Sequence, residues 1–307
     1  MPRNRYPSMN LVLYLAVVLI WGTTWIALKW QLGPVPIPLS IAYRFALAAI
    51  VLFALLAWKR QLVRPRGKAA GLVLVQGLCL FCINFVCFLN ASRTLPSGLV
   101  AVVFSTSTLW NALFARVFLG RRIAPQVLAG GAFGLAGLCL LFWPELAGHA
   151  ADAGILTGFG WALAGTLCFS SGNLLSAALQ ARGLQPAQTN AWGMAFGAGV
   201  LVAWCIATRQ PFVFDPSARY VGALLYLAIP GSVIGFTAYL TLVGRLGPER
   251  AAYCTVLFPI VALNVSAALE GYHWTAMGLC GLVLVILGNL LVFKRPKRGS
   301  GRLAHQS

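Results

Sequence analysis

The chain has 307 residues, of which 60% are hydrophobic and 9% are charged. Soluble proteins usually carry about 25% charged residues, so this composition excludes an ordinary soluble enzyme or binding domain and predicts a protein that lies in lipid. The formal net charge of +18 comes from 23 Lys and Arg against 5 Asp and Glu. In a membrane protein, such an excess is compared with the loop topology before a nucleic-acid partner is considered.

Ten apolar runs predict ten transmembrane α-helices, since a span needs about 20 apolar residues and the backbone can cross lipid only as helices or closed barrels. The fold class is therefore predicted to be all-α and polytopic. The first run follows Arg3 and Arg5, as in a signal peptide, but its length and its three tryptophans favour a retained helix. In chain order, the runs lie near residues 9–30, 39–58, 70–90, 95–118, 124–143, 155–179, 188–208, 218–242, 248–269 and 274–294.

Lys and Arg residues are distributed unevenly between the two sides of the membrane that ten spans define. Four of the 23 fall on one side, and Arg44 and Arg116 lie within runs. The other 17 share the opposite side with the N-terminal residues 1–8 and the basic tail 295–307. Because cytoplasmic loops carry such an excess, both termini are predicted to be cytoplasmic. The net charge then reflects topology, and no nucleic-acid partner is expected.

The chain contains an internal repeat. Residues 95–142 align without a gap on residues 246–293, at a constant offset of 151 residues that pairs Gly120 with Gly271. The sequence therefore predicts two five-helix repeats. Because five is an odd number, the second repeat enters the membrane in the opposite orientation to the first.

The predicted organisation has a first repeat at 9–143, an outer linker at 144–154 and a second repeat at 155–294. Inverted repeats around a site at the midplane can open equivalently to either side, as alternating access requires. The repeat therefore favours a transporter of a small molecule. A non-transporting scaffold or sensor, whose halves only stabilise each other, is the alternative.

Four short motifs lie in these helices: Trp21-Gly22-Thr23-Thr24-Trp25 in the first, Pro38 with Arg44-Phe45 in the second, Phe118-Leu119-Gly120 in the fourth and Phe258-Pro259 in the ninth. With the ten spans and the repeat, the chain resembles EamA-type members of the drug/metabolite transporter superfamily over nearly its whole length. The resemblance implies a carrier in the bacterial inner (plasma) membrane, often an exporter of amino acids or other small metabolites. It also implies that helices 1–4 and 6–9 surround a central cavity.

One departure from the family pattern lies after the fourth helix. The family often has Gly-Glu-Arg there, whereas this chain has Gly120-Arg121-Arg122. No role of the family's glutamate is therefore transferred to this position. In the second repeat, an acid stands one residue before the matching glycine, as Glu270.

Substrate contact is expected from polar and aromatic side chains on the cavity helices. Polar groups are costly inside a bilayer and should face protein or water, while Trp and Tyr combine an apolar face with one polar handle. Hydrogen bonding between helices and interfacial aromatic belts are the alternatives. Arg44 could snorkel to the interface or, turned inward, offer a positive charge to a carboxylate. The candidates are Trp21, Trp25, Arg44, Asn84, Trp110, Asn111, Asn173 and Tyr239.

Gating or coupling is assigned to three further residues. Glu270 follows the ninth helix at its outer end and is the only acid close to a helix core, so it is the sole carboxylate candidate for gating or proton exchange. Pro230 and Pro259 each remove a backbone donor and can bend a helix. A static kink is the alternative for both prolines.

Several kinds of chemistry have no counterpart in the sequence. There is no Gly-x-x-x-x-Gly-Lys-Ser/Thr loop for ATP and no nucleophile–His–acid set, so no catalytic residue is predicted. Cys79 and Cys82 stand without a second pair or a nearby His, so neither a metal nor another cofactor is expected. The expected partners are a small-molecule substrate and the lipid bilayer. Close packing of helices 5 and 10, within the fold or in a homodimer, is predicted from Gly130, Gly134, Gly137, Gly278, Gly281 and Gly288.

Overall fold

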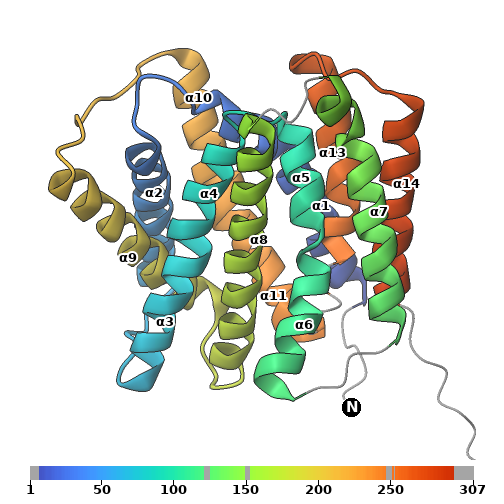
Figure 1. The fold of residues 1–307 in the computed structure, drawn as a ribbon. Helices are drawn as coiled ribbons and strands as arrows, with labels where there is room; N and C mark the ends of the chain where they lie inside the picture. The colour runs from blue at the N-terminus through green and yellow to red at the C-terminus, as the bar shows by residue number, and fades with distance from the viewer. Residues whose placement is uncertain (1–6, 121–124, 149–152, 247–250, 252, 294–307) are drawn as a thin grey trace, which may run out of the picture.

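The computed structural model describes residues 7–120, 125–148, 153–246, 251 and 253–293. Every regular element in these ranges is a helix (Figure 1). In chain order they are α1 (Pro7–Trp30), α2 (Ile37–Trp58), α3 (Lys68–Leu78), the π-helical segment η1 (Cys79–Ile83), α4 (Asn84–Ala91), α5 (Ser97–Ser105), α6 (Ser107–Leu119), α7 (Pro125–Gly148), α8 (Ala153–Gln180), α9 (Pro186–Ala207), α10 (Ala218–Tyr226), the π-helical segment η2 (Leu227–Phe236), α11 (Thr237–Leu246), α13 (Tyr253–Leu269) and α14 (Ala276–Phe293).

These helices have the length and composition of membrane spans. Within the described residues, seven segments are long and apolar enough to cross a membrane, and shorter apolar helices lie at Ala129–Leu141, Leu257–Leu269 and Ala276–Gly288. The predicted all-helical, multi-pass architecture is therefore confirmed. The count of ten spans stays a prediction.

Three of the predicted helices are irregular. Residues 68–91 contain η1, and residues 218–246 contain η2 around Pro230, which lacks a backbone donor and crowds the preceding turn. α5 and α6 are separated at Thr106, where the hydroxyls of Ser105 and Thr106 each donate to a carbonyl three residues earlier, at 2.7 Å. Such bonds compete with the helical backbone pattern.

Two helix pairs lie at opposite edges of the bundle. α7 packs along α14 at one edge and α2 packs along α9 at the other (Figure 1). A Cβ on Gly281 would lie 2.7 Å from the carbonyl oxygen of Gly137, so glycine at this position lets the α7 and α14 backbones touch. The predicted close packing of glycines is thus found between α7 and α14 of one chain. A homodimer through these helices stays a prediction, and it would have to use the faces of α7 and α14 that do not contact each other.

The remaining helices form the centre. α1 contacts α13, α5, η2 and α11, while α8 contacts α4, α5 and α6. The two ends of α1 define the two ends of the bundle. Asn10 accepts a hydrogen bond from Arg245 at 3.1 Å, whereas Lys29 pairs with Glu270. These ends are called the Asn10 end and the Lys29 end below.

Candidate functional site

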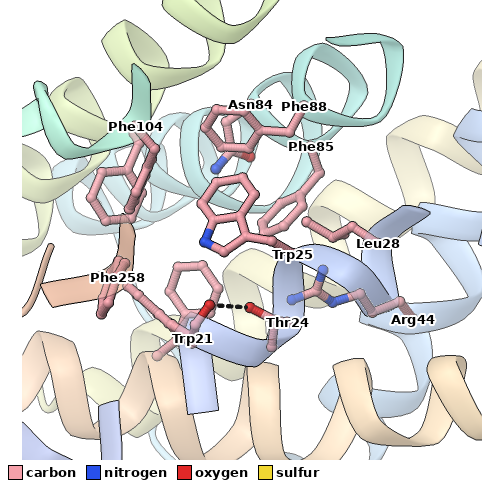
Figure 2. Close-up of a pocket in the computed structure, with 12 residues that line it drawn as sticks. Trp21, Thr24, Trp25, Leu28, Arg44, Asn84, Phe85, Phe88, Phe104 and Phe258 are labelled. Atoms are coloured by element: carbon pink, nitrogen blue, oxygen red, sulfur yellow. Dashed lines mark hydrogen bonds between the residues drawn. The ribbon is translucent and has the colours of Figure 1, made fainter. Parts of the chain in front are cut away.

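A buried pocket lies where the central helices meet (Figure 2). α1 and α4 provide most of its lining, and α2, α5, α8, η2 and α13 contribute one residue each. All of these side chains are buried. They are Trp21, Thr24, Trp25, Leu28, Arg44, Asn84, Phe85, Phe88, Phe104, Phe169, Phe236 and Phe258.

Aromatic rings form most of the pocket wall. The ring centroids of Phe104 and Phe169 are 4.6 Å apart, and those of Trp25 and Phe104 are 5.3 Å apart. The Trp21 ring lies 5.8 Å from that of Phe258. These are contact distances for aromatic pairs, so the pocket is narrow and a substrate can enter only if helices move apart.

Arg44 brings a positive charge to this apolar wall. Its side chain is 2% exposed, and its Nε donates to the Ser232 hydroxyl at 2.9 Å. The guanidinium carbon lies 4.3 Å from the centroid of the Phe85 ring, within the range of a cation–π contact. Within the described part of the chain, its Nη1 has no hydrogen-bond partner. The guanidinium is therefore held firmly but is left with an unused donor.

Two further polar side chains in the pocket also keep unused hydrogen-bonding atoms. Among the described residues, neither Trp25 Nε1 nor either amide atom of Asn84 has a partner. Asn84 follows η1 directly, and π-helical turns are frequent at functional sites. Buried polar groups are normally hydrogen-bonded. Three such groups from three helices facing one pocket (Figure 2) therefore indicate a place for a polar ligand.

The indole N–H of Trp21, unlike that of Trp25, has a hydrogen-bond partner among the described residues. Trp21 Nε1 donates to the carbonyl of Gly231 at 3.0 Å, which ties α1 to η2. A side chain at Gly235 would overlap the Trp21 indole. The two tryptophans therefore have different environments, and within the described part of the chain only the Trp25 indole N–H is left without a partner.

The other predicted binding residues lie outside the pocket lining. Tyr239 packs its ring 5.0 Å from that of Trp21, and its hydroxyl accepts a hydrogen bond from Asn173 at 3.2 Å. Asn111 is buried, and neither its amide nor the Trp110 indole nitrogen has a partner within the described residues. The structure thus brings Trp21, Trp25, Arg44 and Asn84 together, places Tyr239 and Asn173 behind them and leaves Trp110 and Asn111 on α6.

Glu270 lies at the Lys29 end, directly after α13. Its carboxylate is 2.7 Å from Lys29 Nζ and accepts hydrogen bonds from the backbone N–H of Ser97, at 3.1 Å, and from the Ser97 hydroxyl. Burial alone would raise the pKa of this carboxyl, but the bonds from Lys29 and Ser97 oppose it and hold the pKa below its usual value. The acid joins α1, α5 and α13 as an ion-paired cluster, named here the Lys29–Glu270 latch.

The two prolines predicted as bends differ in their surroundings. Pro230 lies inside η2, the same π-helical segment that carries Ser232 and Phe236. Pro259 lies inside α13, which runs as an α-helix from Tyr253 to Leu269. Pro230 therefore accompanies a helix irregularity at the pocket, whereas Pro259 does not.

The sequence alone did not identify the phenylalanines of the pocket wall, nor Lys29 and Ser97 as partners of Glu270. A phenylalanine in an apolar run carries no signal by itself. The offset of 151 residues, extended toward the N-terminus, pairs Phe85 with Phe236, and that pairing could have pointed to the aromatic wall. Across the described residues, no group of three His, Cys, Asp or Glu side chains could hold a metal ion.

The bundle and its pocket define a multi-pass membrane protein with an interior, partly polar pocket. The model of the EamA-like transporter family matches residues 8–143 and 156–294, so the chain belongs to that family. The resemblance seen in the sequence motifs is thereby confirmed.

The chain is similar over most of its length to proteins named as transporters. It is 27% identical over 293 residues to the inner membrane transporter YedA of Escherichia coli (strain K12), with 92% of each chain covered. It is 28% identical over 298 residues to the "Probable amino-acid metabolite efflux pump" of the same strain, covering 90% of this chain and 92% of that protein. A solved crystal structure shares the fold, with a TM-score of 0.69 at 19% identity over 93% of this chain and 96% of the other.

Proposed function

We propose that the protein exports a small amphipathic metabolite, such as an amino acid or a related compound, by alternating access of two inverted five-helix repeats. The central pocket is the observation that carries this proposal. It is buried between helices of both repeats and combines an aromatic wall with unused hydrogen-bonding atoms. A substrate with one polar end and an apolar body fits such a surface.

The inverted arrangement is supported by matching features of the two halves. The family model matches the chain twice, once in each half. The offset of 151 residues carries η1, at Cys79–Ile83, onto residues 230–234 inside η2. η1 directly precedes the lining residue Asn84 and η2 contributes Phe236, so irregular helices approach the pocket from both halves. Two equivalent hinges are what a symmetric rocking motion needs.

The Lys29–Glu270 latch is assigned to the outer gate. The excess of Lys and Arg on the other side of the predicted topology orients the Lys29 end away from the cytoplasm and both termini toward it. The latch joins α1 and α5 of the first repeat to the end of α13 of the second. Opening this end to release substrate would separate the two repeats and break the ion pair.

Glu270 suits a gate better than a proton carrier. A carrier group has to gain and lose a proton near neutral pH, whereas the pKa of this carboxyl is held below its usual value. We therefore favour facilitated transport or exchange of substrates over proton coupling. Pro230 is assigned to the bend that moves, since it lies within η2, and Pro259 to a lesser role.

Counterflow in proteoliposomes tests the transport function. Vesicles that contain the purified protein are loaded with an unlabelled metabolite, and uptake of the same labelled metabolite is followed. Transient, saturable accumulation is expected for at least one compound of a broad panel of amino acids and related acids. A non-transporting scaffold or sensor predicts no protein-dependent flux with any of them, and that outcome would contradict the proposal.

A further inference from the structure

Given the proposed function, on which this rests, we infer that the pocket selects organic anions with an apolar body over zwitterions and cations of the same shape. The compounds in question carry one carboxylate and no ammonium group, as 2-oxo acids do. The selecting group is Arg44, assisted by Trp25 and Asn84.

The charge balance of the pocket favours a negatively charged ligand. The chain has five acids, at positions 145, 152, 215, 249 and 270, and none of these positions belongs to the helical segments that line the pocket. Glu270 already pairs with Lys29. Arg44 thus gives the pocket a positive charge with no carboxylate from the lining helices beside it. A buried guanidinium is best completed by a carboxylate, because the planar donor fork matches two oxygens.

The unused hydrogen-bonding atoms have the same bias. Among the described residues, the unpartnered atoms of the lining include three N–H donors, at Arg44 Nη1, Trp25 Nε1 and Asn84 Nδ2, against a single acceptor, Asn84 Oδ1. A carboxylate accepts hydrogen bonds and donates none, whereas an ammonium donates three and accepts none. The pocket therefore satisfies a carboxylate and leaves an ammonium without enough acceptors.

The aromatic wall does not reverse this preference. Aromatic cages bind quaternary amines by cation–π attraction, but here a cation of the protein already lies against the rings. The Arg44 guanidinium carbon is 4.3 Å from the centroid of Phe85 and 4.8 Å from that of Phe45. A second cation would be repelled by the first at short range and low dielectric. The remaining rings, such as Phe104, Phe169 and Phe258, suit the apolar body of an anion.

The test compares probes that share a body and differ in charge. The purified full-length protein is titrated with phenylpyruvate, L-phenylalanine and phenethylammonium, and then with 4-methyl-2-oxopentanoate, L-leucine and isopentylammonium. Binding is read from the shift in melting temperature and from the fluorescence of the pocket tryptophans. Phenylpyruvate and 4-methyl-2-oxopentanoate are expected to bind with at least about tenfold higher affinity than L-phenylalanine and L-leucine, since pairing of a buried charge dominates the difference in binding free energy. The two cations are expected not to bind.

Two variants connect the preference to its residue. Arg44→Gln removes the charge and is expected to abolish the preference for the anions. Arg116→Gln is the matched control, because Arg116 also lies within a helix but is exposed and outside the pocket; it should leave the order unchanged. Arg44→Lys keeps the charge without the planar fork and should keep the order with weaker binding.

The results separate this inference from the transport function. Equal or tighter binding of the amino acids, or no binding of either 2-oxo acid, would overturn the inference, and the wild-type order decides this even if Arg44→Gln does not fold. Counterflow is measured separately. If amino acids exchange while the 2-oxo acids neither bind nor exchange, transport stands and the charge selectivity is wrong. Selective binding of the anions with no flux of any probe would contradict the transport function and leave the selectivity intact.

Discussion

The central pocket and the Lys29 end each hold a buried or half-buried cation, but their surroundings differ. Lys29 is 35% exposed and meets a carboxylate at 2.7 Å, and that carboxylate is held in turn by Ser97. Arg44 is 2% exposed and contacts a serine hydroxyl and two aromatic rings. In the described part of the chain, it meets no acid within salt-bridge distance.

This contrast is what the proposed gate and the proposed binding site predict. The Lys29–Glu270 latch is complete without a ligand, so its energy favours one arrangement of the helices. The Arg44 pocket keeps an unused donor at high desolvation cost, and a bound anion would complete it. The proposed mechanism uses both features: the latch would break when substrate is released, and the empty pocket would keep hydrogen-bonding groups for the next substrate.

Removal of the Arg44 charge should have the largest effect. Arg44→Ala is expected to raise the half-saturation concentration for 2-oxo acid counterflow by about 30-fold or more, since losing one partner of a buried charge pair costs roughly 2–5 kcal/mol. Initial rates over a range of phenylpyruvate concentrations measure it. Arg116→Ala should behave as wild type. An unchanged half-saturation concentration in Arg44→Ala would place the substrate elsewhere.

Loss of the Ser232 hydroxyl should have an intermediate effect. Ser232 acts through Arg44 as a positioning residue, and Ser232→Ala removes a hydrogen bond to a charged group, which is worth roughly 1.5–3 kcal/mol. We expect about a tenfold rise in the half-saturation concentration, a smaller change in maximal rate and a reduced preference for the anion over the zwitterion. Ser171→Ala is the control, since that hydroxyl bonds its own helix at Leu167. A pure fall in maximal rate with unchanged selectivity would contradict the positioning role.

Breaking the latch should have a smaller effect. Partly exposed ion pairs contribute roughly 0.2–1 kcal/mol, so Glu270→Gln is expected to change the exchange rate by about two- to fivefold without changing which anions bind. The double variant Lys29→Glu with Glu270→Lys should restore most of the wild-type rate. Asp215→Asn serves as a control, because Asp215 is half-buried and bonds the backbone of Ser217. A double variant no better than Glu270→Gln would argue against the ion pair as a gate.

The pH dependence should be the smallest effect. The folded-state pKa of Glu270 is lowered, so the latch is fully present above the ordinary pKa of a glutamate and weakens only as pH falls through the lowered value. Counterflow rates are therefore expected to show no inflection from Glu270 between about pH 6 and 8. A transition in that range that disappears in Glu270→Gln would instead identify Glu270 as a proton carrier.

The sequence identified the polar part of the pocket but not its wall. Arg44 and Asn84 were detectable because charged and amide groups are costly in lipid, and Trp25 because tryptophan combines an apolar face with one polar handle. Phe104 and Phe169 were not, since α5 and α8 are apolar on all sides and a phenylalanine that faces lipid cannot be distinguished in the sequence from one that faces the pocket. The same signals selected Asn111 and Trp110, which lie on α6 beyond the interruption at Thr106, outside the pocket lining.

The overall helix pattern was more predictable than the contacts between helices. Long apolar runs define helices by themselves, and the seven membrane-length segments follow them closely. The pairing of Lys29 with Glu270 joins residues 241 positions apart, and no local pattern specifies such a contact. The irregular segments η1 and η2 also change the phase of a helix, so that the direction of a side chain after them cannot be read from regular spacing.

Alternating access of the central pocket is tested most directly by labelling a cysteine placed there from each side of the membrane. Thr24→Cys, in a background from which the eight native cysteines have been replaced, puts a thiol on the pocket wall in place of a hydroxyl that bonds only its own helix. A membrane-impermeant thiol reagent should label it from either side of sealed vesicles, and phenylpyruvate should slow both reactions. Labelling confined to one side under all conditions would contradict a pocket that opens alternately to both.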